Sequence, residues 1–394
     1  MTPAATLKPD HGARRRHDVF TEEHEDLRAS VRRFVRSELT PHIDEWEETT
    51  FPNAVFARLG ELGFLGLDKP EELGGQGGDF LSAMVLVEEL YYGANAGLAM
   101  GVGVQTDMAM PPIVAFGTPE QKQEWAVPAI AGQKILCLGI SEPDAGSDVA
   151  AIKTRAVRDG DDWVINGTKT YITNGGRADV IVHVTKTDPE AGYDGFTLFL
   201  VPMDSPGVTR SKRLEKLGMH ASDTALIGFE DVRVPGSAVL GDVGRGFYQI
   251  MWELQGERLS GCAGNIAAAQ RAFDLTLEFA RTRKTFGRPI GQHQAVRHRL
   301  AEMAIKLEAG RELTYATARR MMAGEYPVRE VSMTKVFTCR AANEVVDECV
   351  QLHGGAGYMK EYGIERIWRD VRLCRIGGGT DEIMLDVVGK SFGL

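Results

Sequence analysis

The sequence predicts an α+β protein built in three successive parts: helical, β-rich and helical again. Two observations predict this fold class. Apolar residues recur at the three- and four-residue spacing of amphipathic helices in the first and last parts of the chain, whereas short β-rich runs separated by turns fill the middle. We therefore expect a disordered tail over residues 1–19 and three domains over residues 20–134, 135–245 and 246–394.

The overall composition is that of an ordinary soluble globular protein, with 43% hydrophobic and 25% charged residues in a chain of 394. The net charge of −10 argues against a general nucleic-acid binder, whose affinity would rest on a basic surface. A chain of this length can bury a sizeable core, so it needs no disulfide or metal ion to stabilise it.

Cysteine, histidine and apolar patterns exclude several other classes of protein. The five cysteines form no CxxC pair, which is typical of reduced thiols in a cytosol-like compartment. The nine histidines show no metal-binding spacing, and no apolar run reaches the ~20 residues of a membrane span. We therefore expect no metal site. The residues through His17 lack the apolar region of a secretory signal, so we expect a bacterial-type cytoplasmic protein.

The first helical part begins with an amphipathic helix from Thr21 to about Leu39. Shorter helices interrupted by Pro and Gly follow, and one of them is expected to start at Pro119. The glycines within residues 74–78 suggest a phosphate-binding loop, but no strand precedes them and no Gly-Lys-Ser/Thr follows. A turn is therefore expected there.

The middle part contains five β-rich runs, joined by turns such as Asp159-Gly160 and Asn166-Gly167 rather than by helices. This arrangement predicts an antiparallel barrel or sandwich. Helical spacing returns at Phe247, and no GxGxxG sequence follows a strand and opens a helix, so a Rossmann-type NAD dehydrogenase is not predicted. The five predicted strands are Ile135–Ile140, Trp163–Asn166, Val180–Lys186, Phe196–Val201 and Leu226–Val234.

Five motifs in order carry a resemblance to a known family. SEPDAGSD at Ser141–Asp148 and WVINGTKTYITNGG at Trp163–Gly176 resemble the flavin-binding signature of the acyl-CoA dehydrogenases. RKTFGRPIGQHQ from Arg283, QLHGGAGY from Gln351 and GGTDEI from Gly378 resemble that family's C-terminal signatures. The similarity extends from about Phe20 to the C-terminus, and five motifs in register make a chance match very improbable.

The resemblance implies a helical N-terminal domain, a middle β-domain and a C-terminal four-helix bundle. It implies FAD as cofactor and acyl-CoA as substrate, which is desaturated between Cα and Cβ. A carboxylate takes the α-proton while a hydride leaves Cβ for flavin N5, and the electrons then pass to an electron-transferring flavoprotein. The family is built as a homotetramer, a dimer of dimers.

Glu257 is the expected catalytic base. Taken alone, Glu257-Arg258 on a helix is more typical of a solvated surface pair than of catalytic machinery. In the medium- and short-chain branches, however, the base lies on the loop position that Gly378 occupies here, and glycine cannot accept a proton. The long-chain and isovaleryl-type branches carry the base on a helix in a Glu-Arg-Leu context, as this chain does at Glu257-Arg258-Leu259. A glycine at 378 would leave space for the helical carboxylate.

The resemblance also assigns cofactor-binding positions. Ile140 and Ser141 match contacts of the flavin ring edge, Tyr171 and Thr173 match residues that cover the ring, and Ser147 matches a residue that bonds FAD and CoA. A second set reaches the ADP half of FAD across a dimer interface, and Thr380 and Glu382 match adenylate contacts in the same subunit. The remaining expected FAD positions are Leu138, Gly146, Arg283, Phe286, Gln294, Gln351, Leu352, Gly354 and Gly355.

The expected substrate contacts cluster on the helix of the base and on the glycine loop. They are Ser147, Tyr248, Gln255, Arg258, Gly378 and Gly379. The small residues of Gly93–Gly103 lie where the family lines the acyl tunnel, and they would either leave a deep cavity for a long or branched chain or pack two helices closely. The exact chain length is left open.

Two other functions remain to be distinguished from a dehydrogenase. A flavin oxidase or monooxygenase on the same fold would use O2 as electron acceptor, although Glu257 favours the dehydrogenase. A catalytically inactive flavoprotein that binds nucleic acid would need a strongly basic groove, and the net charge of −10 argues against it.

Overall fold

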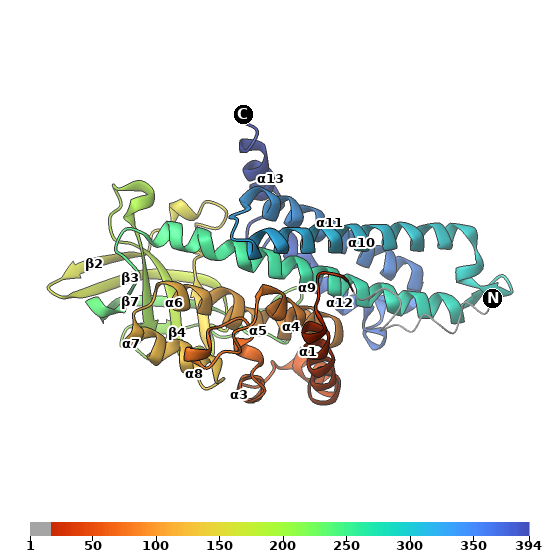
Figure 1. Ribbon diagram of the computed structural model, residues 1–394, viewed down its shortest axis with the longest axis horizontal. Helices are drawn as coiled ribbons and strands as arrows, with labels where there is room; N and C mark the ends of the chain where they lie inside the picture. Colours follow the sequence, from red (N-terminus) through yellow and green to blue (C-terminus); the bar gives the residue numbers. More distant parts are fainter. Residues whose placement is uncertain (1–16, 394) are drawn as a thin grey trace.

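The computed structural model describes residues 17–393. Residues 1–16 of the expected tail over residues 1–19 therefore lie outside the described residues. Three long helices run side by side along the long axis of the molecule, with the sheet at one end and the N-terminal helices along one flank (Figure 1). The order of parts is helical, β and helical, as the sequence predicted.

The N-terminal region consists of helices and short π-helical turns. The predicted amphipathic helix is α1, which begins after the capping residue Thr21 and continues into a π-helical turn, η2, that ends at Leu39. The helix predicted at Pro119 is α7, capped by the hydroxyl of Thr118. Gly74 lies in a turn, as expected, and the other glycines of residues 74–78 lie in an irregular loop, where their backbone nitrogens donate to residues 67–70. The helices are α1 (Glu22–Phe34), α2 (Ile43–Glu48), α3 (Ala54–Glu61), α4 (Phe80–Gly93), α5 (Ala96–Gly103), α6 (Met110–Phe116), α7 (Pro119–Gln121) and α8 (Val127–Ile130), with π-helical η2 (Val35–Leu39), η6 (Val104–Ala109) and η7 (Lys122–Ala126).

The middle region is one eight-stranded sheet in the order β6-β7-β3-β2-β4-β5-β8, with β1 paired to β4. Most neighbours are antiparallel, as expected, but β1 and β2 each pair with β4 in parallel. The strands are β1 (Leu136–Gly139), β2 (Arg155–Asp159), β3 (Asp162–Thr173), β4 (Val180–Lys186), β5 (Phe196–Pro202), β6 (Val208–Arg210), β7 (Thr224–Pro235) and β8 (Val239–Leu240).

All five predicted strands are present, and three further strands were missed for identifiable reasons. β2 has the sequence RAVRD and buries only Ala156, so it carries no apolar alternation. β6 and β8 are three and two residues long, too short for any pattern to emerge. These strands form because their neighbours offer free backbone partners, which is information that is not local in the sequence.

The C-terminal region is helical, as expected, and α9 connects it to both other regions. The first turns of α9 pack on the sheet, while its later part packs on α4, α10 and α11. The elements are α9 (Gly246–Thr282), the hairpin β9 (Lys284–Thr285) and β10 (Arg288–Pro289), α10 (Gln294–Met322), α11 (Val328–His353), η12 (Gly354–Tyr358), α12 (Ile364–Val371), η14 (Arg372–Arg375) and α13 (Asp381–Lys390). Figure 1 shows α13 projecting from the bundle.

The small residues of Gly93–Gly103 are used for close packing. A Cβ on Gly97 would lie 3.0 Å from the backbone nitrogen of Ala221, and a Cβ on Gly101 would lie 2.6 Å from the ring of Phe51. These distances are shorter than ordinary contacts, so glycine is what lets α5 approach its neighbours. Of the two alternatives for this stretch, the structure favours close packing at these positions.

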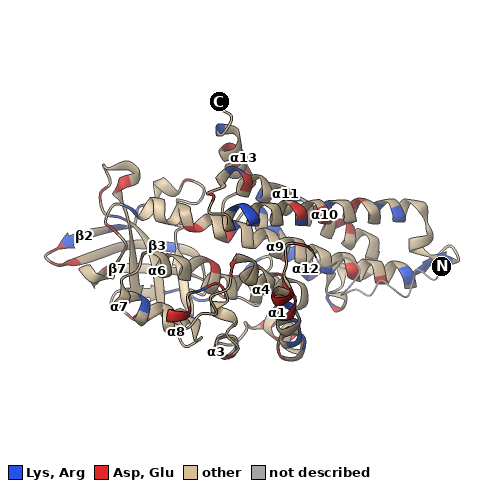
Figure 2. Ribbon diagram, viewed as in Figure 1, with Lys and Arg blue, Asp and Glu red and all other residues tan. Residues whose placement is uncertain are grey.

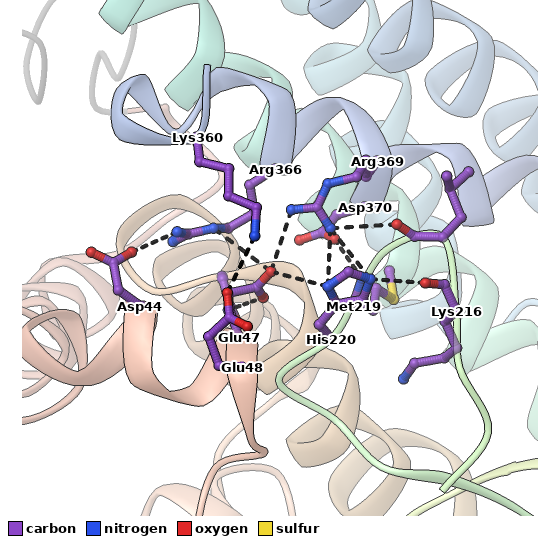
Figure 3. A network of polar contacts seen from close by, with 12 residues as sticks. Asp44, Glu47, Glu48, Lys216, Met219, His220, Lys360, Arg366, Arg369 and Asp370 are labelled. Atoms are coloured by element: carbon purple, nitrogen blue, oxygen red, sulfur yellow. Dashed lines mark hydrogen bonds and ion pairs between the residues drawn. The ribbon is translucent and has the colours of Figure 1, made fainter. Parts of the chain in front are cut away.

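A buried network of charges joins the three regions (Figure 3). Glu47 on α2 lies 3.5 Å from Nη2 of Arg369 on α12 and 3.8 Å from the ring of His220 in the middle region. Asp370, also on α12, accepts a 2.5 Å hydrogen bond from the backbone nitrogen of Met219. Burial and the charge of Glu47 raise the pKa of Asp370 to about 7.

Both basic and acidic residues occur on the long helices α9, α10 and α11, whereas α6 and α8 carry no charged residue (Figure 2). Among the described residues, no helix is long and apolar enough to cross a membrane. Over residues 17–393, no group of three or more His, Cys, Asp or Glu side chains is arranged to hold a metal ion.

Candidate active site

Glu257 lies on α9 where this helix passes the glycine loop that precedes α13. A Cβ built on Gly378 would lie 3.0 Å from Oε1 of Glu257, so the carboxylate occupies the space beside this glycine. Gly378 and Gly379 have φ angles of 64° and 102°, which L-residues with a side chain rarely adopt. The loop therefore requires glycine for its backbone as well as for the space that Glu257 fills.

Two buried cations hold this loop against α9. Nε of Arg258 donates a 2.8 Å hydrogen bond to the carbonyl oxygen of Gly378. Nζ of Lys335, on α11, donates to the carbonyl oxygens of Gly379 at 2.6 Å and of Cys374 at 3.0 Å. The backbone that faces Glu257 is thereby fixed by charge-assisted hydrogen bonds, which are stronger than neutral ones.

The environment of Glu257 makes its carboxylate a stronger base than an exposed one. Burial raises the pKa of Glu257, while the charges of Arg258 and Lys335 act in the opposite direction. A raised pKa makes a carboxylate better suited to the removal of a weakly acidic proton.

Two further carboxyl groups near Glu257 were missed at the sequence level. Glu253 lies one turn earlier on α9 and is only 3% exposed. Asp107 lies on η6, where burial raises its pKa to about 7 and the charge of Glu257 adds to the rise. The four-residue spacing of Glu253 and Glu257 places both on one face of the helix, and this spacing could have identified Glu253 from the sequence. No sequence signal pointed to Asp107.

The two halves of the flavin signature meet at the end of β1. The backbone nitrogen of Thr170 donates to the carbonyl oxygen of Ser141 at 2.9 Å, and Nζ of Lys169 donates to that of Ile140 at 3.0 Å. Lys169 is fully buried and pairs with Oε1 of Glu142 at 2.8 Å. Burial lowers the pKa of Lys169 to about 8, opposed by Glu142.

Glu142 in turn folds the loop that carries Gly146 and Ser147. Its carboxylate accepts hydrogen bonds from the backbone nitrogens of Lys153 at 2.6 Å and Thr154 at 3.1 Å. Gly146 and Ser147 are exposed at the tip of this loop. Leu138, Ile140 and Ser141 are half-buried along its base.

Tyr171 presents its ring to the surface beside this loop. It has a φ of 60° and is 73% exposed, so it is not the buried strand aromatic that β3 would otherwise supply. A non-glycine residue in this backbone conformation is uncommon and is often associated with function. Thr173 is half-buried two residues further along β3. An exposed aromatic ring next to the open backbone after β1 fits a planar flavin.

The expected ADP-binding set lies at the far end of α9 and on its neighbours. Arg283 caps the end of α9, and Phe286 lies in the turn of the β9–β10 hairpin, 97% exposed with a φ of 52°. Phe279 stacks on His353 with ring centroids 4.3 Å apart, which brings this hairpin beside the end of α11. The other members are Gln294, at the start of α10, and Gln351, Leu352, Gly354 and Gly355, at the junction of α11 and η12.

The adenylate-binding pair lies at the start of α13. The hydroxyl of Thr380 caps this helix by accepting from the backbone nitrogen of Ile383 at 3.3 Å, and Glu382 is exposed in the first turn. Asp381 between them is buried and pairs with Arg375 and Arg340. The hydroxyl hydrogen of Thr380 is still available for an acceptor such as a phosphate oxygen.

The expected substrate contacts on α9 differ in accessibility. Tyr248 is exposed and lies under the guanidinium of Arg245, whose carbon is 4.4 Å from the ring centroid. Gln255 is buried and donates to the carbonyl oxygen of Met251 at 2.9 Å. Arg258 is buried and engaged with the glycine loop, so it positions that loop.

Three family models match the chain in the order of its three regions. They are the acyl-CoA dehydrogenase N-terminal domain over residues 21–133, the middle domain over 137–232 and the C-terminal domain over 244–393. The fold and the site define a flavin-dependent oxidoreductase. The chain belongs to the acyl-CoA dehydrogenase family.

Individual relatives agree with this assignment but span several branches. The mitochondrial long-chain specific acyl-CoA dehydrogenase of Rattus norvegicus is 38% identical over 99% of this chain and 90% of its own length. The short-chain specific enzyme of Bos taurus is 39% identical over 96% and 93%. Similarity alone therefore does not select a branch.

Solved structures support the same fold and the cofactor. An acyl-CoA dehydrogenase from Geobacillus kaustophilus is 41% identical with a TM-score of 0.94, covering 96% of this chain and all of that one. A glutaryl-CoA dehydrogenase from Mycobacterium smegmatis, solved in complex with FADH2, is 34% identical with a TM-score of 0.90 over 95% of each chain. The protein described here uses FAD, and its reaction is the oxidation of an acyl-CoA thioester.

Proposed function

We propose that the protein desaturates a long- or branched-chain acyl-CoA to the trans-2-enoyl-CoA, with Glu257 as the base that removes the α-proton. The observation that carries the proposal is the contact between the Glu257 carboxylate and the side-chain-free Gly378. The two positions are complementary: the loop position, Gly378, has no carboxylate, and the carboxylate of Glu257 on the helix fills the space beside it.

The chain's own residues account for the proton transfer. The α-proton of a thioester is very weakly acidic, so the negative charge that develops on the thioester oxygen needs preorganised donors. The backbone at Gly378, fixed by Arg258 and Lys335, is rigid enough to supply such a donor. The chemistry that FAD would supply when bound is that of a hydride acceptor. Residues Ile140 to Ser147, Tyr171 and Thr173 would hold its ring, because they form the open surface at the end of β1.

The preference for long or branched chains rests on the position of the base. A carboxylate on the helix in a Glu-Arg-Leu context is the feature shared with those branches. The close packing of Gly97 and Gly101 means that any space for the acyl chain lies elsewhere than at these two glycines.

We infer a dimer from the separation between the residues expected to bind the flavin ring and those expected to bind the ADP half of FAD. The family resemblance extends this dimer to a dimer of dimers. Arg283 lies 26 residues beyond Glu257, at the end of α9, which corresponds to about 39 Å along a helix. We take this span as too long for one FAD molecule to contact both the flavin-side residues and Arg283 within one subunit. The exposure of Phe286 is consistent with a partner subunit's cofactor covering it. An electron-transferring flavoprotein would reoxidise the flavin.

Flavin bleaching with a graded series of acyl-CoAs tests the proposal. Purified protein is mixed anaerobically with short straight-chain, isovaleryl- and palmitoyl-CoA, and the flavin absorbance is followed. Rapid bleaching by palmitoyl- or isovaleryl-CoA, but not by short straight chains, is expected. Bleaching by none of them would contradict the reaction. Fast reoxidation by O2 with hydrogen peroxide formation would instead indicate an oxidase.

A further inference from the structure

Glu253 is a buried carboxyl group that the proposed reaction does not use. It lies one helical turn before Glu257 on α9 and is 3% exposed. Among the described residues, no N–H or hydroxyl group donates a hydrogen bond to either of its side-chain oxygens. A charged carboxylate without a donor is among the most costly groups to bury, so its protonation state needs an explanation.

The neighbour of Glu253 is another carboxyl group. Glu253 and Glu257 are spaced by four residues and share one face of α9. Two ionised carboxylates are acceptors only, so a hydrogen bond between them exists only when one of them carries a proton. A proton on one member would therefore turn two repelling acceptors into a donor facing an acceptor.

The surrounding charges decide which member carries the proton. Arg258 on α9 and Lys335 on α11 lie close to Glu257 and favour its ionised form. Glu253 is more deeply buried, and the nearby carboxyls of Glu257 and of Asp107 on η6 both disfavour its ionisation, while Arg258 opposes them. Tyr326, which precedes α11, interacts with Arg258. Because Glu253 is the more deeply buried member and, within the described part of the chain, no group donates to its oxygens, we assign the proton to Glu253.

We propose that Glu253 is a positioning residue of the reaction: a neutral carboxylic acid that donates a hydrogen bond to Glu257 and keeps this half-buried base ionised. The inference rests on the proposed role of Glu257. Without the donor, burial would favour protonated Glu257, which cannot accept the α-proton. During turnover the Cα–H bond breaks, an O–H bond forms on Glu257 and the hydride leaves Cβ for FAD. The pair then holds two protons and loses one to solvent on product release.

The pH dependence of anaerobic flavin reduction distinguishes this role from the alternatives. Glu253→Leu removes the donor, so the pKa of Glu257 rises and the acid limb of the rate profile moves up by about one pH unit or more. Glu253→Gln keeps an N–H donor, so its limb stays near that of the wild type. Glu278→Gln, at an exposed position of the same helix, is the matched control and leaves the limb unchanged. If Glu253 were ionised, Glu253→Leu would move the limb to lower pH, and that result, or no shift at all, overturns the proposal.

Infrared spectroscopy tests the protonation state without substrate or turnover. The difference spectrum between wild type and Glu253→Gln at neutral pH should contain the carbonyl stretching band of one protonated carboxylic acid. A carboxylate band in its place would refute the proposal. Because this measurement needs only folded protein, it remains decisive if Glu253→Leu fails to fold. It also separates the two ideas, since failure of Glu257 as base would leave the infrared result unaffected.

Discussion

Adding a single methyl group at Gly378 should slow flavin reduction without removing the cofactor. The Cβ of Gly378→Ala would lie 3.0 Å from Oε1 of Glu257, inside ordinary contact distance, so the carboxylate must shift by a few tenths of an ångström. A misplacement of about 1 Å can cost a factor of about 10² in rate, so a shift of this smaller size predicts a loss of roughly tenfold. The φ of 64° adds a strain of roughly 1–2 kcal/mol for a residue with a Cβ.

Gly377→Ala is the matched control in the same loop. A Cβ there meets only Leu373, at 3.8 Å and beyond, and the residue is not in the left-handed region. Both variants are compared by anaerobic stopped-flow reduction, thermal melting and flavin content. We expect FAD to be retained in both, because neither Cβ would meet Ser141 or Thr380, and reduction to slow only in Gly378→Ala. Equal rates in the two variants would refute the placement of Glu257 against Gly378.

Three further predictions follow from the same contacts. Glu257→Gly combined with Gly378→Glu should recover part of the bleaching activity lost in Glu257→Gly, limited by the strain at position 378; no recovery would mean that the loop cannot host the base. Lys169→Met leaves the Glu142 carboxylate buried without its cation, at a cost of about 3–5 kcal/mol, and should lower the flavin-to-protein ratio after dialysis. Unchanged flavin content would argue against the link between this pair and the cofactor. Asp370 has a folded pKa of about 7, above its unfolded value, so the folded state holds the extra proton and stability falls as pH rises from about 4 to about 7. Asp370→Asn should flatten the melting temperature across this window, and an unchanged slope would contradict the assignment.

Local patterns were sufficient to predict the three-part order and the apolar strands. Val180–Lys186 coincides with β4, since β-branched residues on a buried strand leave a clear signature. The parallel pairing of β1 with β4 was not predictable, because the partner of a strand depends on the path of the intervening chain. The polar strand β2 was missed for the same reason.

The approach of Glu257 to Gly378 was expected, because the loop position lacks a carboxylate and the helix position carries one. The structure places the two residues together. The catalytic role of Glu257 stays a prediction. Glu253 and Asp107 were not expected. A glutamate four residues from another resembles a solvated pair on a helix surface until the packing around α9 is known. Asp107 lies in a π-helical turn, where helical spacing gives no guide to the face a side chain occupies.

The most direct test of Glu257 as base is the single-turnover reduction of Glu257→Gln by the acyl-CoA that bleaches the wild-type enzyme fastest. The amide keeps the size of the side chain but cannot accept the α-proton. The variant should purify with a full complement of FAD, bind the thioester and show no bleaching over the time in which the wild type is fully reduced. Reduction at a near-normal rate would show that another group removes the proton.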